Sequence, residues 1–205
     1  MASDHRMKGQ REVKLDLGEA GYCPSEPELR SPRIVIVGAG MSGILMGMRL
    51  AAAGIETFRI YEKAGRVGGT WRDNTYPGLA CDIPADLYRY SDRPHFEWSN
   101  RFARGAEIQG YIEQVADQAG LVPFISFGRE VSGSQFRAGK WHVEMADGEH
   151  VVADILISAC GVLHHPRYPE ISGLDTFAGP VFHTARWDHS ADLAGAQQTS
   201  RLQVD

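Results

Sequence analysis

Several features that would assign this chain to a particular class of protein are scarce or missing. Three cysteines occur among 205 residues, Cys23, Cys81 and Cys160, and none is paired at the spacing of a metal site. Neither a disulfide framework nor a zinc site is predicted. No apolar run approaches the roughly 20 residues that cross a bilayer, and the first thirty residues lack the apolar core of a signal peptide. We therefore expect a cytoplasmic protein with reduced thiols, no metal and no membrane partner.

An excess of positive charge is also missing. Lys and Arg number 21 against 26 Asp and Glu, which gives a formal net charge of -5. A basic face of the kind that binds nucleic acid or anionic lipid is not indicated. With 43% hydrophobic residues, a chain of this length can bury roughly 70% of its unfolded surface in a core. Small molecules are the expected ligands, and nucleic acid is not an expected partner.

The first strong pattern in the chain is that of a dinucleotide-binding unit. Residues 34–37 are a continuous apolar run, which predicts a strand buried on both faces of a parallel sheet. A glycine-rich turn follows, and then an apolar helix that ends at Ala53 with Gly54 in the usual position after it. A second strand over Thr57–Tyr61 brings Glu62 to its end. Together these elements are typical of a βαβ unit of the Rossmann type.

The turn between the first strand and the helix reads Gly-Ala-Gly-Met-Ser-Gly, and each glycine has a physical role. Gly38 would permit the tight turn, Gly40 would let the backbone approach a pyrophosphate, and Gly43 would let helix and strand pack closely. The start of the helix, with Ser42, offers unpaired N–H groups to phosphate. Glu62 can accept hydrogen bonds from a ribose. These five residues are candidate cofactor ligands, and a purely structural glycine turn is the alternative.

Further along, periodicity predicts one more helix and several strands. Residues 106–119 keep apolar side chains at i, i+3, i+4 and i+7, and Gly120 follows as a cap. A hairpin with an Asp-Gly turn indicates an antiparallel flap added to a parallel α/β sheet. The expected strands are 122–127 together with the segment ending at Val131, the hairpin strands 141–145 and 151–152, and a buried strand within 154–161.

Residues 177–188 read FAGPVFHTARWD, so that Phe177, Gly179, His183 and Trp187 form the pattern FxGxxxHxxxW before an aspartate. This pattern resembles the fingerprint of the Baeyer-Villiger (class B flavin-dependent) monooxygenases. Taken alone, a buried aromatic and a hydrogen-bonded core histidine would be the plainer interpretation of Trp187 and His183. The resemblance implies that both act in a linker that moves during turnover, without transferring a proton.

A second glycine-rich stretch follows the second strand and is similar to the family motif that runs along FAD. The resemblance implies that Gly69, Thr70 and Trp71 border the flavin, that Asp82 sits near its reactive edge, and that Tyr88 contacts the cofactor. Asp82 would also help to hold an arginine over the flavin, so the resemblance makes Asp82, His183 and Trp187 the candidate catalytic residues. The alternative for this stretch is a loop with a Pro-Gly turn and a core tryptophan.

The strand within 154–161 ends in Ser-Ala-Cys-Gly, which resembles the family's Ala-Thr-Gly with Cys160 in place of the threonine. The family resemblance also places the backbone near Val131 at the adenine end of FAD. His164 and His165 lack a third ligand at metal spacing, so a solvated linker is favoured over a metal site.

These patterns predict a fold class and a division of the chain. The fold expected is a Rossmann-like FAD-binding domain, a parallel sheet with an antiparallel flap, belonging to a flavoprotein with two dinucleotide-binding domains and truncated here. The resemblance covers residue 33 to about 195. The expected segments are a flexible arm over 1–31, the FAD-binding domain over 32–161, an inter-domain linker over 162–195 and a polar tail outside the family pattern over 196–205.

The resemblance implies an FAD-dependent, NADPH-using monooxygenase that converts a ketone and O2 to an ester or lactone through a C4a-peroxyflavin. No second GxGxxG follows the fingerprint, so the NADPH site is expected to be mostly absent, and the chain alone is not expected to oxidise NADPH in response to ketones. A fragment and one half of a split enzyme, with a separate C-terminal half chain as partner, both fit. A non-catalytic FAD-binding remnant also fits, as does an N- or S-oxidising class B monooxygenase, although Trp187 argues against the latter.

Overall fold

The strand β1 (Ile34–Val37) lies at the centre of a four-stranded parallel sheet. β2 (Phe58–Glu62) pairs with one edge of β1, and β7 (Ile155–Ser158) pairs with the other. β3 (Ile125–Phe127) extends the sheet beyond β2, which gives the order β3-β2-β1-β7. The predicted parallel α/β sheet is confirmed, because β1–β2, β1–β7 and β2–β3 all pair in parallel.

The structure is a computed structural model that describes residues 30–93 and 96–194. The predicted tail over 196–205 and nearly all of the predicted arm over 1–31 lie outside the described residues. No helix among the described residues is long and apolar enough to cross a membrane.

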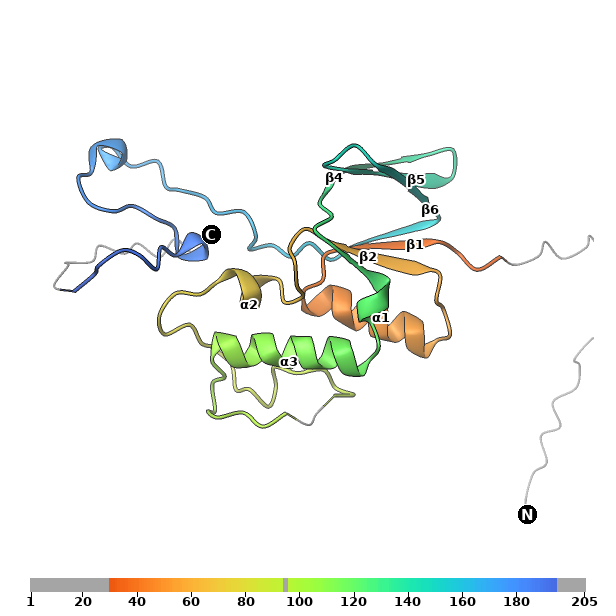
Figure 1. Ribbon diagram of the computed structural model, residues 1–205, viewed down its shortest axis with the longest axis horizontal. Coiled ribbons are helices and arrows are strands. Elements are labelled where there is room, and N and C mark those ends of the chain that lie inside the picture. Colours follow the sequence, from red (N-terminus) through yellow and green to blue (C-terminus); the bar gives the residue numbers. More distant parts are fainter. Residues whose placement is uncertain (1–29, 94–95, 195–205) are drawn as a thin grey trace, which may run out of the picture. The chain divides into compact units, whose positions relative to one another are not determined.

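Helices cover one face of the parallel sheet. Ile34 and Ile36 point to this face and are almost fully buried. Their cluster includes Ile44 of α1 (Met41–Ala52) and Ile108 of α3 (Gly105–Gln118). Successive side chains of a strand point to opposite faces, so the neighbouring Val35 belongs to a different cluster. Figure 1 shows α1 and α3 together below the sheet.

A three-stranded antiparallel sheet covers the opposite face. β5 (Lys140–Met145) is its central strand and pairs with β4 (Val131–Arg137) and β6 (His150–Ala153). Val143 and Met145 of β5 are buried in the same cluster as Val35. The predicted antiparallel flap is thus a second sheet packed on the first, and its hairpin strands are confirmed.

The helix boundaries follow their local signals. α1 ends at Ala52, with Ala53 as its cap, and Gly54 takes φ +73° in the position predicted for it. α3 (Gly105–Gln118) ends in the same way, one residue before Ala119 and the left-handed Gly120 at φ +64°. Both glycines adopt a conformation that is costly for other residues.

Two of the predicted strands are wrong in part. Residues Val122–Phe124 form a 3-10 helix, because Pro123 lacks an N–H and its fixed φ suits a helical first turn. The strand β3 is therefore only three residues long. Val131 does not end this strand but begins β4, after a turn in which Gly128 takes φ +65°. β4 itself was not predicted, because its exposed side chains show little apolar alternation.

The strand β7 is less buried than predicted. It is the last strand in the sheet order and has one neighbouring strand among the described residues, so Ile155 is 42% exposed. Its sequence is continuously apolar, which resembles a strand covered on both sides. Position at the sheet edge, which the sequence does not encode locally, accounts for the difference.

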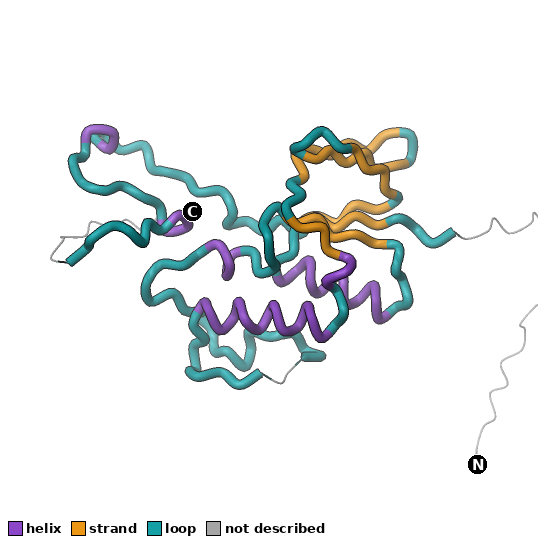
Figure 2. The backbone as a smooth tube through the Cα atoms, viewed as in Figure 1, coloured by secondary structure: helices purple, strands orange, loops and turns teal. Residues whose placement is uncertain are grey.

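Loops make up most of the remaining described chain (Figure 2). The segment from β7 onward is a connector with two short 3-10 turns, Leu174–Thr176 and Thr184–Arg186. The loops between α2 (Thr70–Asp73) and α3 pack on the buried ring of Tyr111, 1% exposed. These loops reach the core through aromatic contacts rather than through regular structure.

Replacing Tyr111 with Phe should destabilise the fold, because it removes a hydroxyl group that makes two hydrogen bonds. This hydroxyl accepts a hydrogen bond from the Tyr90 N–H at 2.8 Å and donates one to the Arg93 carbonyl at 3.1 Å. The variant leaves a buried N–H without a partner, so the free energy of unfolding should fall by about 1–3 kcal/mol. Urea unfolding followed by circular dichroism measures this loss. Y76F is a matched control, since Tyr76 makes no side-chain hydrogen bond among the described residues, and equal losses in both variants would contradict the assignment.

A pH-dependent part of the stability is expected from Glu107. Its carboxylate accepts hydrogen bonds from the backbone N–H groups of Ser99 at 2.8 Å and Arg104 at 3.1 Å, and the bond from Ser99 holds the pKa of Glu107 below its usual value. A lowered pKa in the folded state means that the ionised carboxylate stabilises the fold. This stabilisation is fully present above the unfolded pKa of about 4.3 and is lost as the pH falls through the folded pKa.

E107Q should therefore be less stable than the unchanged protein at pH 7, and the difference should shrink below about pH 4.5. Unfolding free energies measured from pH 7 to pH 4 check this, with E56Q, at an exposed position, as the control. A difference that stays constant over this range would rule out the linkage.

Candidate functional site

A cavity of about 340 Å³ opens at the carboxyl ends of β1, β2 and β7. In open α/β sheets, ligands bind outside the carboxyl ends of the strands where the strand order reverses. Here the chain moves from β1 outward through β2 to β3, and then returns to the other side of β1 with β7. Nine predicted cofactor residues line the cavity: Gly38, Gly40, Ser42, Glu62, Gly69, Thr70, Trp71, Tyr88 and Val131.

The first glycine turn is fixed by close backbone contacts. Gly38 has φ +101°, and a Cβ at this position would lie 2.6 Å from the Ala159 carbonyl oxygen at the end of β7. A Cβ at Gly43 would lie 1.9 Å from the Gly38 carbonyl oxygen, so this glycine lets α1 start directly against the turn. Gly43 does not line the cavity but shapes the turn that does.

The N-terminus of α1 faces this cavity without a side-chain cap. Gly40 is the N-cap residue, no side chain bonds to the first-turn amides, and no acidic residue lies in the first turn. Such an end has unpaired N–H groups and a partial positive charge, which suit a phosphate. The residues present therefore fit the diphosphate of a dinucleotide.

The second glycine turn meets the first. The Gly68 N–H donates to the Ala39 carbonyl at 2.9 Å, and a Cβ at Gly40 would lie 3.6 Å from the Cα of Gly69. A Cβ at Gly68 would fall 1.8 Å from Oε1 of Gln109, a buried residue of α3 whose amide also donates to the Val67 carbonyl. Close approach of these segments favours glycine at Gly68, which also takes φ +128°, whereas a Cβ at Gly40 would make an ordinary contact with the second turn. Gly40 faces the second turn as well as the cavity.

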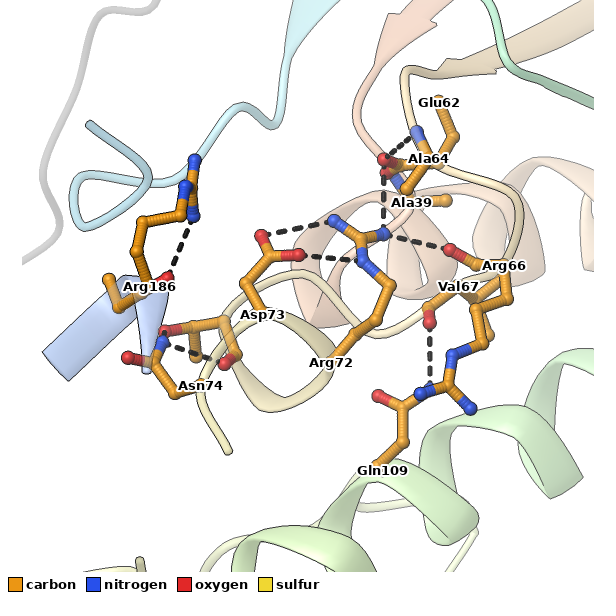
Figure 3. A network of polar contacts seen from close by, with 12 residues as sticks. Ala39, Glu62, Ala64, Arg66, Val67, Arg72, Asp73, Asn74, Gln109 and Arg186 are labelled. Atoms are coloured by element: carbon orange, nitrogen blue, oxygen red, sulfur yellow. Dashed lines mark hydrogen bonds and ion pairs between the residues drawn. The ribbon is translucent and has the colours of Figure 1, made fainter. Parts of the chain in front are cut away.

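Glu62 is buried at the end of β2 and is 4% exposed. Its Oε2 accepts from the Ala39 N–H at 2.8 Å, and its Oε1 accepts from the Ala64 N–H at 2.9 Å. Oε1 also lies 3.0 Å from Nη1 of Arg72 (Figure 3). A carboxylate has about four acceptor positions, and the chain itself uses three of them. Glu62 therefore keeps about one position for a ribose hydroxyl.

Arg72 was not singled out by the sequence, yet it lies at the centre of this network (Figure 3). Its side chain is 8% exposed, its Nε and Nη2 bond both carboxylate oxygens of Asp73, and its Nη1 also donates to the Arg66 carbonyl at 2.8 Å. Burial acts to lower the pKa of the Arg72 guanidinium, but hydrogen bonding to Asp73 and the charge of Glu62 outweigh it and raise that pKa. Removing one partner of such a buried pair typically costs about 3–5 kcal/mol.

Trp71 and Tyr88 form another part of the cavity wall. The indole Nε1 of Trp71 donates to the Tyr88 hydroxyl at 2.9 Å, and the two rings meet edge to face at 5.5 Å between centroids. Burial raises the pKa of Tyr88, so its hydroxyl remains protonated at neutral pH. The pair offers a rigid, largely apolar surface beside α2.

The three residues predicted to be catalytic do not line this cavity. Asp82 is exposed and follows the buried Cys81. His183 and Trp187 lie on the connector. The cavity wall therefore includes most of the predicted cofactor ligands and none of the predicted catalytic residues.

The fingerprint segment forms a small folded turn. Nδ1 of His183 accepts from the Ala185 N–H at 3.0 Å, and the His183 N–H donates to the Tyr168 hydroxyl at 3.1 Å. Trp187 packs edge to face on Phe182, with ring centroids 4.9 Å apart. Both fingerprint side chains therefore hold the local shape of the connector.

One further contact joins the connector to the loop after α2. Nε2 of His189 lies 2.8 Å from Oγ1 of Thr75, and neither residue was predicted. The two residues are 114 positions apart, so no local sequence signal could have indicated this contact.

Other unpredicted residues complete the cavity wall near β4 and β7. Arg129 contributes a guanidinium that is paired with Asp147 and Glu149. Cys160 and the two histidines of the connector also line the wall. Within residues 30–93 and 96–194, no group of three or more His, Cys, Asp or Glu side chains could hold a metal ion.

Comparison with known proteins identifies the relatives of this arrangement. Residues 36–102 match the family of NAD(P)-binding Rossmann-like domains. An uncharacterized monooxygenase of Mycobacterium tuberculosis is 52% identical over 166 residues, which cover 81% of this chain and 34% of that protein. A Baeyer-Villiger monooxygenase of Streptomyces coelicolor is 46% identical over 165 residues, which cover 80% of this chain and 32% of that protein.

The same relationship is found among solved structures. The crystal structure of OTEMO in complex with FAD and NADP superposes with a TM-score of 0.71 and 34% identity, over 79% of this chain and 32% of that one. The chain spans about a third of the length of the relatives it matches. The resemblance read from the sequence is confirmed: this chain is similar to Baeyer-Villiger monooxygenases over their N-terminal part.

Proposed function

We propose that this chain binds FAD in the cavity at the carboxyl ends of β1, β2 and β7. In this proposal it forms the FAD-binding part of a cytoplasmic, NADPH-dependent monooxygenase of Baeyer-Villiger type, which converts a ketone and O2 to an ester or lactone. One observation carries the proposal: two glycine turns meet above the uncapped N-terminus of α1, where a diphosphate fits.

The side chains and amides around the cavity have distinct tasks in this proposal. The first-turn amides of α1, including that of Ser42, bind the diphosphate, and the remaining acceptor position of Glu62 takes a ribose hydroxyl. FAD, when bound, supplies the redox chemistry by which O2 is activated. The Trp71 and Tyr88 pair borders the ring system and excludes water from it. The backbone at Val131 lies at the adenine end.

Gly69 and Thr70 begin α2 on the wall of the cavity. Their backbone lies against the first glycine turn, which supports a place for them beside the flavin. Close backbone approach at this point leaves no room for side chains between protein and cofactor.

The proposed roles of Asp82, His183 and Trp187 are conformational or electrostatic. The exposed carboxylate of Asp82 can orient an arginine from another part of the enzyme, whose charge would favour a developing oxyanion. The turn held by His183 and the packing of Trp187 support a role in keeping the connector in one shape while domains move.

A second candidate is an FAD-binding module without catalysis of its own. The observation that favours it is the position of the three predicted catalytic residues outside the cavity wall. The two candidates differ in one experiment, in which this chain is mixed with the separately expressed C-terminal two thirds of the Streptomyces coelicolor relative. Ketone-dependent NADPH oxidation in the mixture supports the enzyme with a separate half chain as partner. FAD binding without turnover favours the module.

The FAD site itself is tested with Gly40→Val. A Cβ at Gly40 would make an ordinary contact 3.6 Å from the Cα of Gly69, but Gly40 lines the cavity, so the two valine methyl groups would occupy space next to the ligand. We expect the Kd for FAD to rise at least about tenfold, because the backbone can no longer approach the diphosphate. Titration of the purified chain with FAD, followed by flavin fluorescence, measures the change.

Gly65→Val is the matched control. Nothing lies within 4 Å of a Cβ at Gly65, and this residue is not part of the cavity wall. It should bind FAD as the unchanged chain does. Equal affinity in the Gly40 and Gly65 variants would remove the first turn from the cofactor site, and no FAD binding by the unchanged chain would overturn the proposed function.

A further inference from the structure

We propose that Arg72 is a positioning residue of the dinucleotide site: it holds the Glu62 carboxylate against the first glycine turn and offsets its negative charge beside the bound diphosphate. This inference rests on the proposed binding of FAD. It assigns a role to a residue that neither the glycine motifs nor the fingerprint includes.

Arg72 lies on the cavity wall and contacts both glycine turns through their neighbouring segments. Its Nη1 lies 3.0 Å from Oε1 of Glu62, whose other oxygen accepts from the Ala39 N–H in the first turn. The same Nη1 donates to the Arg66 carbonyl, in the segment that leads into the second turn. One guanidinium nitrogen therefore fixes a contact to each turn (Figure 3).

The backbone N–H and C=O of Ala39 show how the position of the Glu62 carboxylate affects a bound ligand. Its N–H is held by Glu62 and its C=O accepts from the Gly68 N–H, so both of its polar groups are fixed by the second turn or the strand before it. The next residue, Gly40, is the N-cap of α1. A shift of the Glu62 carboxylate would therefore move the turn that aims the first amides of α1.

Charge provides the second part of the argument. A buried carboxylate without a partner would repel a diphosphate bound nearby, and interactions of this kind are strong where water is excluded. Arg129, another cation on the cavity wall, is already paired with Asp147 and Glu149. Among the described residues, the guanidinium in contact with Glu62 is that of Arg72.

The planar guanidinium is suited to this position in a way that an ammonium group is not. Arg72 bonds Asp73 through two nitrogens while it also reaches Glu62 and the Arg66 carbonyl, which uses the fork of fixed N–H directions. A lysine could keep the positive charge but could not satisfy all three partners at once. Replacing Arg72 with lysine therefore separates the effect of the positive charge from the effect of the guanidinium geometry.

The principal variant is Arg72→Met, and the control is Arg49→Met. Arg49 makes a surface ion pair with Asp92 at 3.2 Å and is not part of the cavity wall, so its loss should not change FAD affinity. For R72M we expect the Kd for FAD at pH 8 to rise about tenfold or more. Circular dichroism shows whether each variant is folded, and R72K, which should bind FAD with intermediate affinity, keeps the test valid where R72M does not fold.

A second substitution separates positioning from a merely structural role. In R72M the buried carboxylate of Glu62 has lost its cation, so neutralising this carboxylate as well should relieve the repulsion of the diphosphate and tighten FAD binding.

Double variants identify which carboxylate is responsible. R72M/E62Q should bind FAD more tightly than R72M at pH 8, because the uncompensated charge is gone. R72M/D73N should bind FAD as weakly as R72M, since Asp73 is 26% exposed and can be solvated after Arg72 is lost.

The outcomes distinguish this inference from the proposed function. If the unchanged chain binds FAD and R72M binds it with equal affinity, Arg72 has no positioning role while the FAD site stands. If R72M/E62Q binds FAD no more tightly than R72M, or R72M/D73N restores binding equally well, the inference is also overturned, because the uncompensated charge then belongs to another group. If the unchanged chain binds no FAD, both fail.

Discussion

The hydrogen bond from the Ala39 N–H to the buried carboxylate of Glu62 connects the end of β2 to the turn after β1. Through it, the position of a strand end determines where the N-terminus of α1 points. The carbonyl of the same residue accepts a hydrogen bond from the second glycine turn, so the two turns cannot move independently. Burial makes this arrangement demanding, because a carboxylate away from water must have all its partners in place. The shape of the cavity wall therefore depends on the hydrogen-bond and ion-pair partners of Glu62 as much as on the glycines of the two turns.

The elements that could be predicted from the sequence are those with local causes. The apolar run of β1, the glycine after α1 and the apolar stripe of α3 each determine their own structure, and the structure has them within one or two residues. The 3-10 turn at Pro123 was missed, although proline is a local signal, because the apolar run around it matched a strand. β4 was missed for a different reason, since an exposed strand is defined mainly by its pairing with β5.

The residues of the candidate site also fall into those with a local signal in the sequence and those without one. The glycines of the site could be predicted from the sequence, because few residues tolerate the backbone conformation of Gly38 or the contact at Gly43. Arg72 could not be predicted, because a charged residue beside another charged residue usually lies in solvent. Its burial depends on a carboxylate ten positions away. The contact between His189 and Thr75 joins segments more than a hundred residues apart. Such partners become visible only when the chain is folded.

The sheet order also has a consequence for synthesis of the chain. β1 is made early, but its second neighbour, β7, comes last among the strands, and the Arg33 N–H bonds an aspartate that follows it by 121 residues. At roughly 5–20 residues per second, a ribosome needs about 6–24 s to make that interval. During this time an edge rich in isoleucine and valine has no pairing partner. An edge left open in this way favours association between nascent chains until β7 is made.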